Sequence, residues 1–392
     1  MIVYILFLFL FYIVIIYIMS SFEGILFHSS QPEATQDNYI EYNNVDFVLA
    51  VGEGRSLLRN SVRINGDIFI SNDNGTTVSA GKVYMDERIG AHAVIDSIQT
   101  SFSGAGGVKE VIQNYGRWAT MDAIGTIYED DYNSAKYQCE LRAPTQLNSA
   151  KNAKGEVTLG TTPVSDNLDF SIKPLCILNK MAGDHLPYEK SGDIRLTVNL
   201  ARNMSALMGA NQGTNASYTL TNLHVSYSSV PTNGDPMKTA TTMRSVYNVK
   251  STILSGSANI QAQVPAVCDA VSCSFQSQDR ENVNVFSNYD CNTVQGISQV
   301  EFLFNDATNK YITYQMSDQN EMLHRYVDSF KNTGHNQVML DTFRTNKGFG
   351  IGLHFQGFVN LANQRFGVQL NSDVDNTSPM NIYLYFHSLI SA

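Results

Sequence analysis

Two segments of the sequence decide the fold class: Gly192-Asp-Ile-Arg-Leu-Thr-Val-Asn-Leu200 and Thr219-Leu-Thr-Asn-Leu-His-Val-Ser-Tyr227. In both, apolar and polar residues alternate, which is the pattern of a strand with one buried face. The pattern stops at Val230-Pro-Thr-Asn-Gly-Asp-Pro236, where proline and glycine interrupt strand pairing. Residues 168–227 are therefore predicted to be the closing strands of one β-sandwich, and residues 231–236 the joint to another.

The same closing pattern occurs near the end of the chain. Arg365-Phe-Gly-Val-Gln-Leu370, a polar loop and Met380-Asn-Ile-Tyr-Leu-Tyr-Phe386 correspond to Arg195–Leu200, a polar loop and Thr219–Tyr227. The pattern repeats although the two stretches show no clear sequence identity. The repetition indicates two domains of the same architecture.

We therefore predict an all-β protein with two tandem eight-stranded jelly-roll barrels (a double jelly roll), short helices in loops and an apolar N-terminal segment. A chain of 392 residues is long enough for two cores. Its low charged fraction of 16% and its 20 tyrosines and 20 phenylalanines also favour strands. The predicted divisions are an apolar segment (1–19), an N-terminal arm (20–46), the first jelly roll (47–230), a linker (231–239) and the second jelly roll (240–392).

Local motifs predict individual turns and helices. Apolar residues on both sides of Asn65-Gly66 predict a β-hairpin there. His92–Phe102 is predicted to be one core strand. Helical spacing of apolar residues predicts amphipathic helices over Val108–Ala119, with Trp118 on the packing face, and over Met322–Phe330.

The N-terminus carries an apolar run, Ile2–Met19, about as long as a helix that spans a bilayer. The first basic residue is Arg55, so the run lacks the charged start of a secretory signal. Three interpretations stay open: a membrane anchor, a signal segment, or an extension upstream of a functional start at Met19.

The order of these features resembles the viral double jelly-roll major capsid proteins, a lineage that includes tectiviruses, virophages, polinton-like viruses and adenovirus hexons. The resemblance depends on a strand, a Gly-rich turn and a helix, followed in order by Phe170-Ser-Ile-Lys-Pro-Leu175, Leu186-Pro187, Gly192–Leu200 and Leu223-His-Val-Ser-Tyr227. It implies a structural protein of the virion that is assembled inside the host cell and has no enzymatic activity. Three two-barrel subunits would form a pseudo-hexagonal capsomer of an icosahedral shell.

The resemblance also implies partners. They are two further copies of the chain in a homotrimer, neighbouring capsomers, and penton and minor capsid proteins. An internal viral membrane contacted through residues 2–19 is a further candidate partner, suggested by the apolar run, which is not a general trait of that lineage. No direct contact with nucleic acid is expected, because the net charge is −10 and no run of Lys or Arg occurs.

No catalytic, cofactor-binding or metal-binding residue is predicted. The sequence lacks the HExxH, GxSxG and phosphate-loop motifs. Asp86-Glu87 is interpreted as solvated loop charge, and the histidines as barrel-lining or interface residues. The five cysteines are predicted to be buried free thiols, with a Cys268–Cys273 disulfide as the alternative.

Two other functions are considered. A membrane-anchored or secreted β-sandwich protein for attachment or carbohydrate binding would account for residues 2–19 and for the glycosylation sequons at Asn74, Asn203, Asn215 and Asn376. A glycan-cleaving enzyme is suggested only by the fold class, and it would need paired carboxylates that face each other across one groove.

Overall fold

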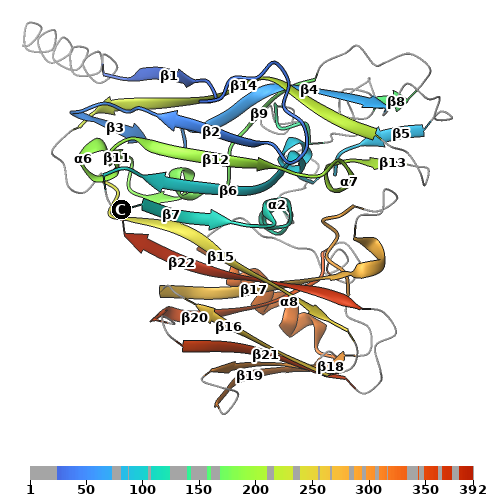
Figure 1. The fold of residues 1–392 in the computed structure, drawn as a ribbon. Coiled ribbons are helices and arrows are strands. Elements are labelled where there is room, and N and C mark those ends of the chain that lie inside the picture. The colour runs from blue at the N-terminus through green and yellow to red at the C-terminus, as the bar shows by residue number, and fades with distance from the viewer. Residues whose placement is uncertain are drawn as a thin grey trace, which may run out of the picture.

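Two groups of antiparallel sheets follow one another along the chain in this computed structural model (Figure 1). The structure describes residues 24–72, 81–86, 88–104, 107–123, 139–142, 157–159, 168–209, 216–232, 239–254, 257–264, 267–281, 287–293, 297–304, 309–315, 317–332, 343, 348–360, 364–372 and 379–391. Everything said below about structure concerns these residues.

The first group contains two principal sheets. One has the order β1 (Leu26–Ser30), β14 (Ala216–Pro231), β4 (Arg63–Asn72) and β9 (Leu168–Ile172). On the β4 side of β14, this sheet is extended by β3 (Arg55–Leu58) and β11 (His185–Pro187). The other sheet has the order β2 (Asn44–Leu49), β12 (Ile194–Leu200), β6 (Ile95–Phe102) and β7 (Gly107–Ile112).

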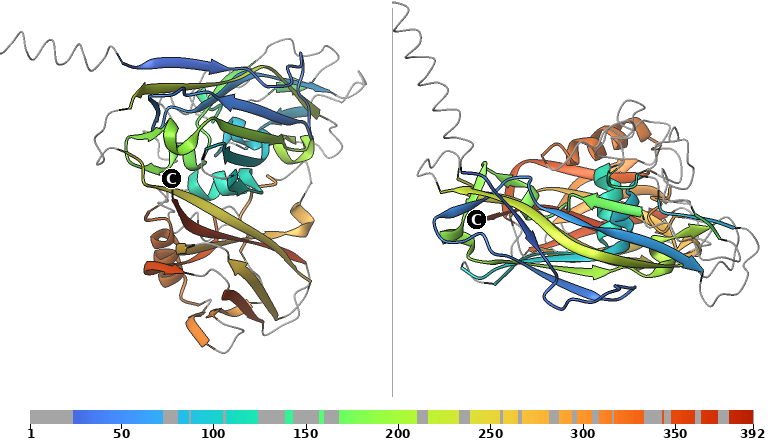
Figure 2. Two further views of the ribbon diagram at one scale, coloured as in Figure 1. Left: turned by 60° about the vertical axis from the view of Figure 1, so that its left-hand side comes forward. Right: turned by 90° about the horizontal axis from the view of Figure 1, so that it is seen from above.

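The second group has the same plan. One sheet has the order β15 (Thr242–Ile253), β22 (Met380–Ser391), β17 (Val267–Ser277) and β20 (Gly350–Asn360), and β10 (Met181–Ala182) joins its β15 edge. The other has the order β16 (Ala258–Val264), β21 (Gln364–Ser372), β18 (Ile297–Phe304) and β19 (Asn309–Gln315). In the left-hand view of Figure 2 the two groups lie one above the other, with β15 and β22 at the boundary.

The connectivity of the two groups is identical. When the principal strands of each group are counted along the chain, one sheet has the order 1-8-3-6 and the other 2-7-4-5. Two packed sheets with this Greek-key order form a jelly roll. The predicted fold class, a double jelly roll, is confirmed, and the group from β1 to β14 is called here the first barrel and the group from β15 to β22 the second barrel.

Smaller elements connect these strands. A three-stranded sheet of β13 (Met208–Gly209), β5 (Gly81–Tyr84) and β8 (Val157–Leu159) lies at the end of the first barrel opposite the C-terminus (Figure 1). The helices are η2 (Gly90–Val94), α2 (Tyr115–Ala123), η3 (Ile177–Asn179), α6 (Tyr188–Ser191), α7 (Asn203–Ala206), η4 (Gln278–Arg280) and α8 (Gln319–Ser329). None of the described helices is long and apolar enough to cross a membrane, and Ile2–Met19 lies outside the described residues.

The decisive segment forms strands for the reason its pattern indicates. In β12 the side chains of Ile194, Leu196 and Val198 are buried while Arg195 is exposed, so one face of the strand lines the core. Gly192 begins the segment in a left-handed conformation (φ 59°), and a Cβ there would lie 2.6 Å from the backbone nitrogen of Gly104. Glycine is therefore required where this corner packs against the β6–β7 turn.

The predicted hairpin at Asn65-Gly66 is wrong. Strand β4 runs without a turn through both residues and pairs along its length with β14. A Cβ on Gly66 would lie 2.8 Å from the Leu223 side chain and 3.0 Å from the Thr221 carbonyl, beside a β-bulge in β14. The glycine therefore allows a close approach of two strands, a role that glycine in a strand also has.

The predicted helix over Val108–Ala119 is correct only in its second half. Its first half is β7, in which Glu110 and Ile112 are buried and Val111 is exposed, and the helix α2 begins at Tyr115. In a helix over this stretch Glu110 would lie on the polar face, whereas the period-2 burial of a strand puts this carboxylate inside.

Three further differences concern boundaries. The predicted arm 20–46 contributes β1 and the start of β2 to the first barrel. The predicted strand His92–Phe102 begins with the 3-10 helix η2 and becomes β6 at Ile95. The predicted helix over Met322–Phe330 is present as α8, which packs against β20 and β17.

Candidate functional site: the junction between the two barrels

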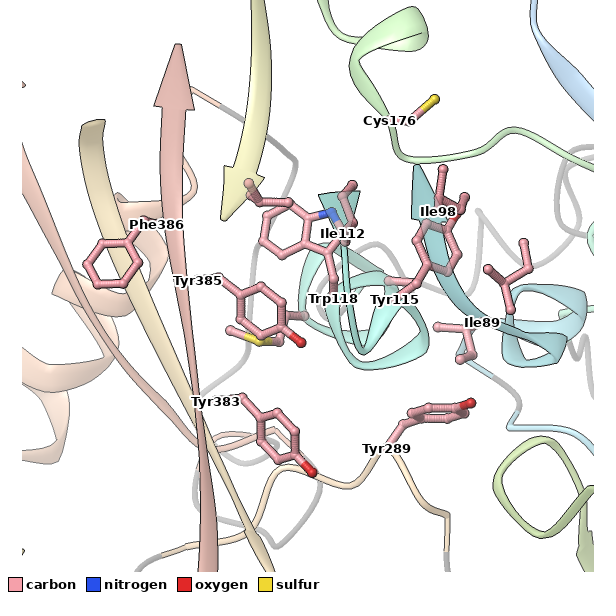
Figure 3. Packing of buried hydrophobic residues seen from close by; sticks show 14 of the residues in the cluster. Ile89, Ile98, Ile112, Tyr115, Trp118, Cys176, Tyr289, Tyr383, Tyr385 and Phe386 are labelled. Carbon is pink, nitrogen blue, oxygen red and sulfur yellow. The ribbon is translucent and has the colours of Figure 1, made fainter. Parts of the chain in front are cut away.

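Helix α2 of the first barrel packs into the boundary with the second barrel. Trp118 is buried, and its ring lies 5.4 Å from the rings of Tyr385 and His387 on β22 and 5.9 Å from Phe330 after α8. Figure 3 shows Trp118 and Tyr385 approaching each other from α2 and β22. The only tryptophan of the chain therefore joins the cores of the two barrels.

A segment of the second barrel makes the reciprocal contact. The Tyr289 hydroxyl donates a hydrogen bond to the Ala93 carbonyl of η2 at 2.9 Å. Its ring packs on α2 at Gly116, where an added Cβ would lie 2.5 Å from ring carbons. A residue without a side chain is thus needed on this face of the helix.

A buried ionic cluster lies beside Tyr289. The Arg88 guanidinium binds both oxygens of Asp86, at 2.9 Å through Nε, and binds Asp290 of the second barrel at 3.0 Å. Ser287 donates a further hydrogen bond to Asp86. Burial alone would raise the pKa of Asp86, but the charge and hydrogen bonds of Arg88, with the Ser287 hydroxyl, lower it to about 2. One cation therefore holds carboxylates from both barrels.

Arg117 on α2 is a second cation that binds groups of the other barrel. It donates to Gln276 Oε1 at 2.6 Å, to the Asn288 carbonyl at 2.7 Å and to the Asp290 carbonyl at 3.0 Å. Its guanidinium stacks on the ring of Tyr383, 4.2 Å from the centroid. Planar stacking combined with several donors is the geometry that suits Arg and not Lys.

The end of β7 completes the junction. The Tyr385 hydroxyl donates to the Asn114 carbonyl at 3.1 Å, and the Asn114 amide donates to Asn248 on β15 at 2.9 Å. Nearby, the buried Glu110 faces Ser245 and Val246 on β15. The two barrels are thus connected by aromatic packing, ion pairs and directional hydrogen bonds, an arrangement that fixes their relative position.

A metal cluster and a pair of facing carboxylates are two arrangements that could support catalysis. The described residues contain no group of three or more His, Cys, Asp or Glu side chains that could hold a metal ion. A hollow of about 400 Å³ beside α8 has one carboxylate, Asp328, among its lining residues. It does not present the paired carboxylates that a glycosidase needs.

Four of the five cysteines are buried, as are three of the seven described histidines, His92, His185 and His387. His387 is buried against Trp118 and Ser272, and burial lowers its pKa to about 3, so it is neutral. Cys176, Cys268, Cys273 and Cys291 are buried free thiols, whereas Cys139 is exposed, which corrects the prediction for that residue. Cys268 and Cys273 lie five residues apart along one strand, roughly 16 Å, too far for a disulfide.

One sequon can be judged directly. The Asn203 side-chain carbonyl accepts a hydrogen bond from the Tyr218 amide at 3.0 Å at the start of α7. This asparagine therefore has a structural role. Asn74, Asn215 and Asn376 lie outside the described residues.

The ionic part of the junction was missed by sequence reasoning. Asp86 was interpreted as solvated loop charge, but it is 3% exposed and ion-paired. Its main partners lie 2 and 201 residues away, and only Asp86-x-Arg88 is visible as a local signal. Contacts between loops that are far apart in the sequence produce no periodic pattern that a single sequence could reveal.

Exposed apolar side chains mark surfaces that could contact other molecules. They are Leu26, Phe27, Ile40, Tyr42, Val108, Val111, Met204, Tyr247, Leu254 and Phe358. Phe27 on the edge strand β1 is 84% exposed. Tyr42 has a left-handed backbone (φ 63°) and is 66% exposed beside Arg202. A large side chain held outward at a strained position suggests a contact surface.

Comparisons with known proteins locate this fold. No protein-family model and no curated protein matches the sequence. Among solved structures, the Faustovirus major capsid protein is 9% identical with a TM-score of 0.63, over 94% of this chain and 90% of that chain. VP54 of PBCV-1, in a structure fitted into a cryo-EM reconstruction of the virophage Sputnik, is 11% identical with a TM-score of 0.60, over 94% of each chain. The mavirus major capsid protein is 10% identical with a TM-score of 0.50, over 93% of this chain and 87% of that chain. Since these likenesses cover both barrels, the chain has the double jelly-roll fold found in viral major capsid proteins.

Proposed function

We propose that this protein is the major capsid protein of an icosahedral virus and that it works as a structural subunit without enzymatic activity. The observation that carries the proposal is the shared fold over nearly the whole chain, both here and in the Faustovirus protein. The junction supports it, because two barrels that are locked together behave as one rigid building block. Such a block suits repeated assembly better than catalysis.

The proposed assembly is a homotrimer in which six barrels give a pseudo-hexagonal capsomer. Three subunits around a closed threefold axis present six similar outer sides, which can occupy a sixfold position in a shell. The exposed apolar residues, which include Phe27 on β1 and Phe358 on β20, would form contacts within and between capsomers. Neighbouring capsomers, penton and minor capsid proteins are the further partners.

We assign the two ends of the subunit different surroundings. The chain ends at the left of Figure 1, opposite the sheet of β5, β8 and β13. Strand β1 begins at the same side of the molecule, and residues 2–19 precede it in the sequence, so we place an internal viral membrane on that side. The small sheet at the other end would then form part of the outer surface of the virion.

The domain division that we propose retains the linker at 231–239 and the second jelly roll at 240–392. The pairing of β1 with β14 supports extending the first jelly roll from residue 47 to Leu26. Direct binding of nucleic acid is not part of the proposal, because the net charge of −10 would repel phosphates.

Light scattering on the purified full chain tests the trimer. Three copies of a 43.4-kDa chain give a particle of about 130 kDa. Phe27→Ser and Tyr42→Ser are informative variants, and Arg59→Ser, at an exposed position of the first barrel, is a control that removes no exposed apolar group. A chain that stays monomeric at high concentration, with both barrels folded, would contradict the proposal.

A further inference from the structure

Glu110 occupies an unusual position for a carboxylate. It lies on β7, the edge strand of its sheet, where the first barrel meets β15 of the second barrel (Figure 1). Only 3% of the residue is exposed. Its Oε2 accepts a hydrogen bond from the Ile177 amide at 2.9 Å. Its Oε1 has no partner with hydrogen-bond geometry, although the Ser245 hydroxyl and the Val246 amide lie close enough to favour the charged form.

The neighbouring cations are engaged with other carboxylates. Lys180, which follows η3, binds Asp122 of α2 at 3.2 Å, and its ammonium lies 4.9 Å from the centre of the Trp118 ring. Arg244 on β15 binds Asp269 of β17 at 2.7 Å. Cys176, which interacts with Glu110, is neutral near pH 7 because burial raises its pKa to about 12. His387, which packs against Trp118, is neutral because burial lowers its pKa to about 3. Among the described ion pairs, none includes Glu110.

The space around Glu110 is tightly packed. The hollow that it lines with Trp118, Leu175, Lys180, Arg244, Ser245 and Val246 has no room for a water molecule. The Trp118 Nε1–H, which lines the same hollow, also lacks a hydrogen-bond acceptor. An ionised carboxylate here could be hydrated only if β7 and β15 moved apart.

We propose that Glu110 is a proton-controlled latch between the two barrels. Its neutral carboxyl fits the tightly packed junction, whereas its ionisation admits water between β7 and β15 and weakens the contact between these strands. The latch lies within one chain, so it stands independently of the proposed capsid function. It would allow the pH of the surroundings to change the rigidity of the two-barrel unit.

The direction and size of the effect follow from proton linkage. Burial raises the pKa of Glu110 from 4.5 to about 7, opposed mainly by the Ile177 amide and then by Ser245, Lys180 and Val246. A raised carboxyl pKa in the closed state means that its contribution is fully present below pH 4.5 and is lost as the pH rises through 7. A difference of about 2.5 pKa units limits the change in the closed-to-open equilibrium to about 300-fold.

Hydrogen exchange on the full chain between pH 5.5 and 8.5 tests the latch, after correction for the intrinsic pH dependence of exchange. In the native chain, the amides of residues 174–180 and 242–253 are expected to be at least tenfold less protected above pH 7 than at pH 5.5. Glu110→Gln should keep that protection at high pH, because a neutral amide can still accept the Ile177 hydrogen bond. Glu321→Gln, at the exposed ion pair with Arg325 on α8, is the matched control and should behave as the native chain does.

The same pH response in Glu110→Gln and in the native chain would overturn the proposal. If Glu110→Gln does not fold, the native chain still provides a test through infrared titration with carboxyl-labelled glutamate. A protonated glutamate with a midpoint near 7 is expected. Complete ionisation of every glutamate below pH 6 would refute the latch.

Discussion

Replacing Arg88 with Met should weaken the junction more than any surface change. The substitution removes the buried cation from Asp86 and Asp290 while keeping a side chain of similar length. Asp86 would retain the Ser287 hydroxyl and the residue-88 amide as donors, but its charge would be uncompensated. Breaking a buried ion pair from one side costs about 3–5 kcal/mol.

The pKa of Asp86 gives an independent magnitude. Its depression from 3.8 to about 2 corresponds to about 2–3 kcal/mol of stabilisation of the carboxylate in a fully buried site. Because the folded-state pKa is depressed, this stabilisation is present above pH 3.8 and is lost as the pH falls towards 2. In Arg88→Met the remaining carboxylate favours protonation, so the deficit should be largest at pH 7 and should shrink on mild acidification.

Urea unfolding followed by tryptophan fluorescence is the appropriate assay. Trp118 is the only tryptophan and lies in the junction, so its signal reports the contact between barrels. Adding Asp86→Asn to Arg88→Met should recover part of the loss, since both charges are then absent. Arg325→Met, at an exposed ion pair on α8, should change the free energy of unfolding by less than about 0.5 kcal/mol. A loss below about 1 kcal/mol in Arg88→Met at pH 7 would refute the account of the cluster.

Three other perturbations follow from the same structure. Gly116→Ala should destabilise the junction by about 1–2 kcal/mol in urea unfolding, despite the better helix propensity of alanine, because the new Cβ would meet the Tyr289 ring. Gly357→Ala, at a position with open space around it, should be nearly neutral, and the reverse order of the two variants would contradict the packing. Ile194→Asp should abolish soluble assemblies in size-exclusion chromatography by placing an unpaired charge in the first core, at a cost of more than about 4 kcal/mol, whereas normal assembly would mean that the strand face is misassigned. A native chain treated with a thiol reagent should react rapidly at one site, Cys139, and rapid reaction of several thiols would show that the buried ones are accessible.

Alternation and duplication could be predicted from the sequence because they are local or periodic. The alternating residues of β12 and β14, and their counterparts in β21 and β22, identified closing strands that the structure places in equivalent positions of the two barrels. The jelly-roll fold class was predicted from the repeated plan and not from any single motif. The fold class was therefore accessible without a solved relative.

Other features depend on contacts between distant residues. Gly66 has the local appearance of a turn, but its neighbour Leu223 across the sheet decides its role. Glu110 has the appearance of a polar helix position until β6 pairs with β7 and buries it. Likewise, the structural role of Asp86 depends on Ser287 and Asp290, which lie about 200 residues later in the sequence. One sequence contains no signal for such pairs, and the junction could only be found in three dimensions.

The junction connects the duplicated fold with its proposed role in assembly. Two independent barrels on a flexible linker would not keep the fixed separation that six positions around a threefold axis require. Trp118, Arg117 and Tyr289 each make contacts across the boundary, so we expect the barrels to keep one relative position in the assembled particle.

Cryo-electron microscopy of the soluble oligomer formed by the full chain tests the central claim most directly. We predict a threefold particle with a hexagonal outline, built from six barrels, in which each subunit contributes two barrels joined through α2 and the Tyr289 segment. A particle with one barrel per subunit position, or with barrels in variable relative orientations, would contradict it.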